Sequence, residues 1–263
     1  MSFLKLFSDL PAWSAFVLTL LWVLGAFEIG YRFGVVRHRN AADEKAGPVG
    51  QLGVATLGML GFFLAFSFGL AANRYDAKRQ LVIDEANALG TTYLRTDFLE
   101  EPARTRAREL LREYVAVRLG DPRNGGIQEM VRRSEALQGE LWTLVVANTG
   151  GAQTTPRTAL LIASLNETID LHGKRVIAGI YSRIPVGIFV VLDLMTILAM
   201  FAIGYHAALS ETRRSPAILP LALTFAVVMW LIAELDQGYA GLLAVSQQPL
   251  IEAQRGMAEP KPP

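Results

Sequence analysis

Four apolar stretches, each close to the length of a membrane-spanning helix, are separated by segments of very different length. About 20 helical residues cross the roughly 30 Å hydrocarbon core of a bilayer. The stretches expected to do so lie at residues 11–33, 51–72, 185–208 and 216–235. The pattern therefore predicts an all-α, polytopic membrane protein with four transmembrane helices.

A polar insert separates the second stretch from the third, and its apolar residues recur at helical spacing. The helix of the second span is expected to continue into the insert without a break. One further helix is expected to begin at Pro102 and to end before Gly120, and another is expected over residues 127–147. A last helix is expected from the cap Thr155 and the first-turn residue Pro156 up to the third span. The insert is thus predicted to be a bundle of antiparallel helices.

These patterns divide the chain into four parts. Residues 11–72 carry spans 1 and 2, and residues 73–184 form an extramembrane helical domain continuous with spans 2 and 3. Residues 185–236 carry spans 3 and 4. Residues 237–263 are predicted to be an interfacial segment and a tail, with packing on the insert as the alternative for the apolar part of that segment.

The side of the membrane on which the insert lies is not decided by charge. An even number of spans puts both termini and the insert on the same side. Lysine and arginine follow both ends of the spans: Arg37 and Arg39 lie in one short loop, whereas Arg74, Arg79 and Arg183 border the insert. The positive-inside rule therefore counts for both orientations.

Small residues form a narrow stripe on the second span. At 100° per residue, Gly58, Gly61, Ala65 and Gly69 fall on one face of the helix. Stripes of this kind let transmembrane helices approach closely. The partner is either another span of the same chain or a second subunit.

Bulky apolar residues occupy the neighbouring face of the same span. Met59, Phe62, Phe66 and Leu70 recur at helical spacing, and Asn73 and Arg74 follow at its polar end. Several copies around an axis would stack these side chains as hydrophobic rings, which gate pores by excluding water. Contact with lipid or with the protein core is the alternative.

Four carboxylates lie in or beside the spans and are candidate functional groups, because an intramembrane charge is costly. Asp193 has apolar neighbours on both sides in the third span. Glu28, Glu234 and Asp236 lie nearer span ends and are expected to reach the interface. Asp193 is therefore the strongest candidate, and it could pair with a cation, take up a proton or hydrogen-bond a neighbouring helix.

The composition and the absence of known motifs argue against several other classes of function. The net charge is +1, so no attraction to nucleic acid is indicated, and the chain contains no cysteine. His38, His172 and His206 are too scattered to suggest a metal site. No P-loop, dinucleotide fingerprint or hydrolase motif occurs. We therefore expect no cofactor, no metal and no enzymatic activity.

Several segments resemble an uncharacterised bacterial family named for a bestrophin-like domain. The longest is GFFLAFSFGLAANRYDAKRQLVIDEANALGTTYLR, from Gly61 to Arg95. The others are residues 182–185, 234–236 and 245–250. Together they cover the second span, the start of the third and the region after the fourth.

The resemblance implies a distant relation to bestrophins, which are pentameric ion channels with a pore lined by the second span. Phe62, Phe66 and Leu70, followed by Asn73 and Arg74, look like that arrangement. By this resemblance the chain would self-associate in the inner membrane of a bacterium and pass small ions, chloride favoured, with a cytoplasmic insert. It lacks the acidic cluster and the tryptophan-rich stretch of animal bestrophins, so calcium gating is not expected.

Two other functions are compatible with the same layout. A signalling receptor would use the insert as a helical sensor, although no output domain follows the fourth span. A proton- or sodium-driven stator-like subunit would need an essential membrane carboxylate, for which Asp193 is the candidate.

Overall fold

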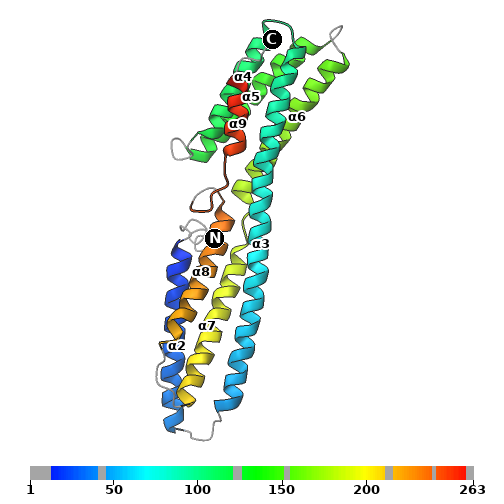
Figure 1. The fold of residues 1–263 in the computed structure, drawn as a ribbon. Coiled ribbons are helices and arrows are strands. Elements are labelled where there is room, and N and C mark those ends of the chain that lie inside the picture. Colours follow the sequence, from blue (N-terminus) through cyan, green and yellow to red (C-terminus); the bar gives the residue numbers. More distant parts are fainter. Residues whose placement is uncertain are drawn as a thin grey trace. The chain divides into compact units, whose positions relative to one another are not determined.

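The structure is a computed structural model that describes residues 13–40, 46–120, 126–150, 155–210, 216–238 and 241–258. Nearly all of these residues are helical, and none of them lies in a strand (Figure 1). The chain divides into two compact units. The span unit comprises residues 1–75 and 183–244, and the insert unit comprises residues 76–182 and 245–263.

Four helices are long and apolar enough to cross a membrane. They are α2 (Trp13–Asn40), α3 (Ala46–Arg95), α7 (Val186–Leu209) and α8 (Ile218–Gln237). The predicted all-α class and the four long apolar helices are therefore confirmed. The expected continuation of the second span is also found, because α3 is one helix from Ala46 to Arg95.

The span unit is held together by an apolar core between its helices. Helix α2 packs along α7 and α8 (Figure 1). The core contains Val23 and Phe27 from α2, Leu60 and Leu64 from α3, Leu192 and Met200 from α7, and Phe225 and Met229 from α8. Each pair is spaced by four or eight residues, or about one or two helical turns, so each helix turns a single stripe inward.

Two glycines let α2 and α7 approach closely. A Cβ added at Gly30 would collide with the carbonyl oxygen of Phe201, and one at Gly204 would collide with that of Phe27. This contact was not predicted from the sequence. Its signal is the small-xxx-small spacing of Gly30 and Gly34 on α2, which is typical of closely packed transmembrane helices.

The insert unit is a bundle built on the last part of α3. After the short turn η1 (Thr96–Phe98) follow α4 (Ala103–Leu119), α5 (Gly126–Thr149), α6 (Pro156–Val176) and the π-helical turn η3 (Ile177–Tyr181); α9 (Gln248–Ala258) completes the unit. Helices expected from Pro102, over residues 127–147 and from Pro156 are thus confirmed, within about three residues.

The start of α6 follows the predicted capping pattern. The Thr155 hydroxyl accepts a hydrogen bond from the Thr158 backbone N–H at 3.2 Å, and the Thr158 hydroxyl accepts one from the Thr155 N–H at 2.9 Å. Pro156 occupies the first turn, where its missing N–H costs nothing. Two backbone donors are satisfied in this way.

One predicted helix is interrupted. The insert was expected to be continuous with span 3, but α6 passes into the π-helical turn η3 and residues 182–185 are not helical. Pro185 explains part of the break, since the residue before a proline is disfavoured in helical conformation. The prediction that the insert helix runs straight into the third span is therefore wrong.

The C-terminal segment contains a further helix. Residues 248–258 form α9, which packs against α4 within the insert unit. Contact of the segment with the membrane interface stays a prediction. Leu250 and Met257 are its buried residues. Packing on the insert, the alternative for part of this region, is what the structure shows for α9. The tail predicted from Glu259 lies outside the described residues.

The close contact of α2 with α7 can be tested by its effect on stability. Gly30→Ala should lower the free energy of unfolding by about 1–3 kcal/mol, the usual cost of overpacking a tight contact. Gly25→Ala is the matched control on the same helix, because a Cβ there meets nothing within 4 Å. Thermal unfolding of the purified protein in detergent measures both. Equal melting temperatures for the two variants would contradict the close approach.

Candidate functional site

Helix α3 has an exposed apolar face in the span unit. Met59, Phe62 and Phe66 are 58%, 68% and 64% exposed. The opposite face is buried, with Leu60, Leu64 and Ala71 in the core of the unit. The two faces differ because the helical period separates Phe62 and Phe66 from Leu60 and Leu64 by more than a right angle. Large aromatic side chains therefore lie where this chain by itself does not cover them.

The small-residue stripe borders the same exposed face. A Cβ added at Gly58, Gly61 or Gly69 would meet nothing within 4 Å among the described residues. These glycines therefore do not serve close packing against another span of the same chain, which was one of the two interpretations. Close packing of the stripe, Ala65 included, against a second subunit stays a prediction.

The remaining residues of the predicted pore are not equivalent. Leu70 is partly buried and packs against the core of the span unit. Asn73 is exposed and Arg74 is half-buried. The structure thus groups Met59 with Phe62 and Phe66 on the exposed face and separates Leu70 from them.

Two of the four carboxylates were expected to reach the interface and are instead buried. Glu234 and Asp236 are each 6% exposed. Asp236 accepts a hydrogen bond at 2.8 Å from the backbone N–H of Ile184, just before α7. The Glu234 carboxylate lies against Gly241, which has φ +100° and no room for a Cβ. Both therefore pack inside the span unit.

The other two carboxylates lie nearer the surface. Glu28 forms an ion pair at 2.6 Å with Arg32, one helical turn away. Asp193 is half-buried, and its carboxylate has no hydrogen bond or ion pair with the residues that the structure describes. The four carboxylates are thus in different settings. No three acidic or histidine residues of the described ranges are placed to hold a metal ion.

The main polar cluster of the insert unit was not predicted. Glu85 of α3 is 0% exposed and forms ion pairs with Arg118 of α4, at 3.1 Å, and with Arg175 of α6. Tyr114 donates a hydrogen bond to Glu85 at 2.8 Å. Arg175 also donates to the side-chain oxygen of Gln247, at 2.9 Å. One carboxylate therefore joins α3, α4, α6 and the residue before α9.

Burial and charge act in opposite directions on this cluster. Burial raises the pKa of Glu85, but the positive charges of Arg118 and Arg175 and the donated hydrogen bonds outweigh it, so its pKa is lowered. Burial, followed by the charge of Glu85, raises the pKa of Tyr114 well above its usual value. Glu85 therefore stays ionised and Tyr114 stays neutral.

His172 lies beside this cluster, with Nδ1 3.1 Å from the Tyr114 hydroxyl. Burial lowers the pKa of His172 from 6.5 to about 4; the charges of Arg118 and Arg175 act in the same direction, and Glu85 opposes them. His172 is consequently neutral at pH 7.

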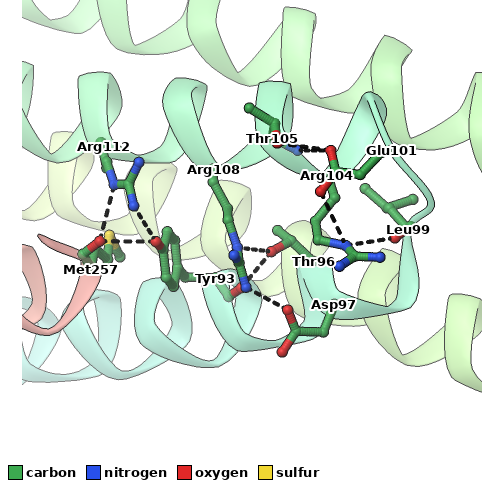
Figure 2. A network of polar contacts seen from close by, with 10 residues as sticks. All are labelled: Tyr93, Thr96, Asp97, Leu99, Glu101, Arg104, Thr105, Arg108, Arg112 and Met257. Carbon is green, nitrogen blue, oxygen red and sulfur yellow. Dashed lines mark hydrogen bonds and ion pairs between the residues drawn. The ribbon is translucent and has the colours of Figure 1, made fainter. Parts of the chain in front are cut away.

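A second polar cluster anchors α9 (Figure 2). The Tyr93 hydroxyl and the Arg112 Nε both donate to the Met257 carbonyl oxygen, at 2.9 and 3.0 Å. Arg112 also lies over the Tyr93 ring, 5.5 Å from its centroid. A cation beside the last carbonyls of a helix is favourable, because these groups carry partial negative charge. This contact explains why α9 packs on the insert unit.

A family model described as a bestrophin-like domain matches residues 17–250. The chain belongs to the bestrophin-like family. The predicted resemblance is therefore confirmed, and the match includes α3, the insert and both later spans. No curated protein matches the chain.

Solved structures show the same fold at low sequence identity. A crystal structure of a bacterial bestrophin homologue from Klebsiella pneumoniae has a TM-score of 0.65 at 15% identity, and it covers 92% of this chain and 96% of that one. A point variant of that homologue has a TM-score of 0.66 at 15% identity, with 93% and 98% covered. This chain and that homologue thus share their architecture over nearly their whole length.

The buried carboxylate allows a direct test. Glu85→Gln should lower the free energy of unfolding by about 3–5 kcal/mol, because it leaves buried guanidinium groups without their counter-charge. Glu140→Gln is the control: its pair with Arg106 is about half exposed, and such pairs contribute about 0–1 kcal/mol. Chemical denaturation followed by circular dichroism measures both. Similar stabilities would show that the cluster does not hold the insert unit together.

The lowered pKa of His172 predicts that acid reduces the free energy of unfolding. Between pH 7 and 5 the unfolded chain takes up a proton at this residue and the folded chain does not, so acidification favours unfolding. A folded pKa of about 4 against 6.5 corresponds to a loss of about 2 kcal/mol over this range. The loss begins as pH falls through 6.5 and is complete near 4.

The measurement is denaturant unfolding at several pH values for the wild type and for His172→Gln. The variant should be less dependent on pH between 7 and 5, because glutamine does not titrate. Identical pH profiles would mean that His172 is not held neutral in the folded protein.

Proposed function

We propose that this chain is the subunit of an oligomeric ion channel whose pathway is lined by the exposed face of α3. Phe62 and Phe66, together with Met59, form the constriction. The observation that carries the proposal is the exposure of these side chains beside glycines at which an added Cβ would meet no described residue within 4 Å. The permeant species is a small ion, with an anion such as chloride favoured by the family.

Physical reasons favour a shared axis over simple contact with lipid. Large apolar side chains are favourable in contact with lipid. Glycines are not, because they expose the polar backbone and lower the stability of the helix. Close packing between helices uses such glycines. On this face of α3, the stripe Gly58, Gly61 and Gly69 would pack against neighbouring copies of the helix. The phenylalanines beside the stripe would then point toward the shared axis. Rings of this kind exclude water from a narrow pore.

Membership of the bestrophin-like family supports the rest of the proposed assembly. Five copies would surround the axis, with Asn73 and Arg74 at the polar mouth of the pore. The insert units would then form a vestibule on the cytoplasmic side of a bacterial inner membrane. A monomeric mass in detergent would contradict the assembly of five copies. A reporter fusion that maps the insert outside the cytoplasm would contradict the cytoplasmic vestibule.

The constriction has a specific test. Phe62→Ala combined with Phe66→Ala should increase ion flux through liposomes by about tenfold or more, equivalent to at least ~1.4 kcal/mol of barrier, because smaller side chains leave room for water. Chloride and sodium gradients are applied separately to identify the ion. Ile29→Ala is the control, since Ile29 is 63% exposed on α2 and lies outside the proposed pore.

A second variant separates the channel from a stator-like subunit. Asp193→Asn should leave passive flux unchanged in a channel, whereas an ion-driven stator would lose its activity. Flux that disappears in Asp193→Asn and is unaffected by the phenylalanine substitutions would refute the α3 pore. Absence of flux from the wild-type oligomer would refute the channel itself.

A further inference from the structure

The exposed face of α3 does not end where the apolar residues end. Helix α3 is unbroken over residues 46–95, so a face defined in its apolar part continues into the insert unit. Five turns of an α-helix take about 18 residues. Gln80 and Asp84 therefore lie on the same face of α3 as Phe62 and Phe66, five turns further along the helix.

This face is also exposed in the insert unit. Gln80, Asn87 and Thr91 are exposed and Asp84 is half-buried, whereas Leu89, on the opposite side of the helix, is buried. Asn87 and Thr91 follow Gln80 and Asp84 at helical spacing, so the four residues form one continuous strip. We call this strip the polar α3 face. It continues the exposed aromatic face of the span unit.

The polar α3 face is acidic. Its one charged residue is Asp84, whose carboxylate accepts a hydrogen bond at 2.9 Å from Nε2 of Gln80, one helical turn away. The basic residues of this part of the helix are Arg74, Lys78 and Arg79. At 3.6 residues per turn, all three lie more than a right angle from the middle of the face.

The charges at the two edges of the face do not change its sign. Asp76 borders it near the span unit and is exposed. Arg95 borders it at the other end, where it donates a hydrogen bond at 2.8 Å to the carbonyl oxygen of Leu160. Carboxylates therefore outnumber basic side chains along this side of α3.

We propose that Asp84 is a charge-selecting residue of the channel. Around the shared axis, the Asp84 carboxylates of the copies form a ring that attracts cations and repels anions. This inference rests on the proposed function, because it needs the α3 face to line the ion pathway. Rings of acidic side chains select cations in other channels. Chloride is the ion that the family favours, and the Asp84 ring acts against it.

Gln80 has a positioning role in this ring. Its amide donates to the Asp84 carboxylate and limits the movement of that side chain, and it brings no charge of its own. The charge acts through water, so its effect extends over about a Debye length, which is about 8 Å at physiological ionic strength and about 3 Å at 1 M. The selectivity of the ring therefore depends on salt.

The ratio of sodium flux to chloride flux through liposomes tests the ring. Asp84→Asn should lower this ratio by about tenfold, since charged linings change the local concentration of counter-ions by about that much or more. The amide oxygen of asparagine still accepts from Gln80, so the fold should be unaffected. Asp84→Glu keeps the charge and should keep the wild-type ratio.

A carboxylate of the insert unit on another helix is the matched control. Asp170 of α6 is exposed and accepts a hydrogen bond at 3.3 Å from the amide of Asn166, four residues earlier, as Asp84 does from Gln80. Asp170→Asn removes the same charge away from the polar α3 face and should leave the flux ratio unchanged. The effect of Asp84→Asn should also shrink at about 1 M salt, which a purely structural effect would not do.

Thiol labelling provides a second measurement, because the chain contains no cysteine. Asn87→Cys, treated with a positively charged thiol reagent, should pass less sodium relative to chloride than the same variant without the reagent. Asn166→Cys is the control, since Asn166 is equally an exposed asparagine but lies on α6. The reagent should leave its flux ratio unchanged.

The outcomes separate this inference from the channel itself. If flux rises in the variant that combines Phe62→Ala with Phe66→Ala, the α3 pathway stands. An Asp84→Asn protein with the wild-type flux ratio would then overturn the ring alone. A wild-type oligomer without any flux would overturn both the channel and the ring.

Discussion

One buried carboxylate, Glu85, holds the insert unit together. A charge taken out of water is stable only when it is paired and hydrogen-bonded, and Glu85 meets this requirement with Arg118, Arg175 and Tyr114. These partners come from α4 and α6, and Gln247 extends the contacts to the residue before α9. The positions of these helices are therefore linked, because moving any one of them would leave a buried charge or polar group without its partner.

Helix α3 carries both the structural and the candidate functional residues of the protein. In the span unit its inner face contributes Leu60 and Leu64 to the core, and its outer face leaves Phe62 and Phe66 exposed. In the insert unit the same helix supplies Glu85 and Tyr93, which bond to the surrounding helices. In the proposed channel, this continuous helix would couple the pore to the insert unit.

Prediction from sequence succeeded where a property is local. The apolar length of each span and the cap formed by Thr155 and Pro156 depend only on neighbouring residues. Prediction failed where distant residues decide. Asp236 was expected to reach the interface, but it binds the backbone of Ile184, which is 52 positions away in the chain. The packing of α9 on α4 likewise depends on contacts between distant residues, which no local pattern contains.

The sequence by itself determined that this is a helical membrane protein of the bestrophin-like family, with an apolar aromatic face on its second span. Helical period and hydrophobic length are sufficient for the helical membrane class and the aromatic face, since the bilayer accepts few other structures. The family rests on the match over residues 17–250. Only the tertiary structure decided which residues of that span face the core, that Leu70 belongs with the core, and that Glu85 is paired with two arginines. These facts depend on contacts between residues far apart in the chain, which a one-dimensional pattern does not encode.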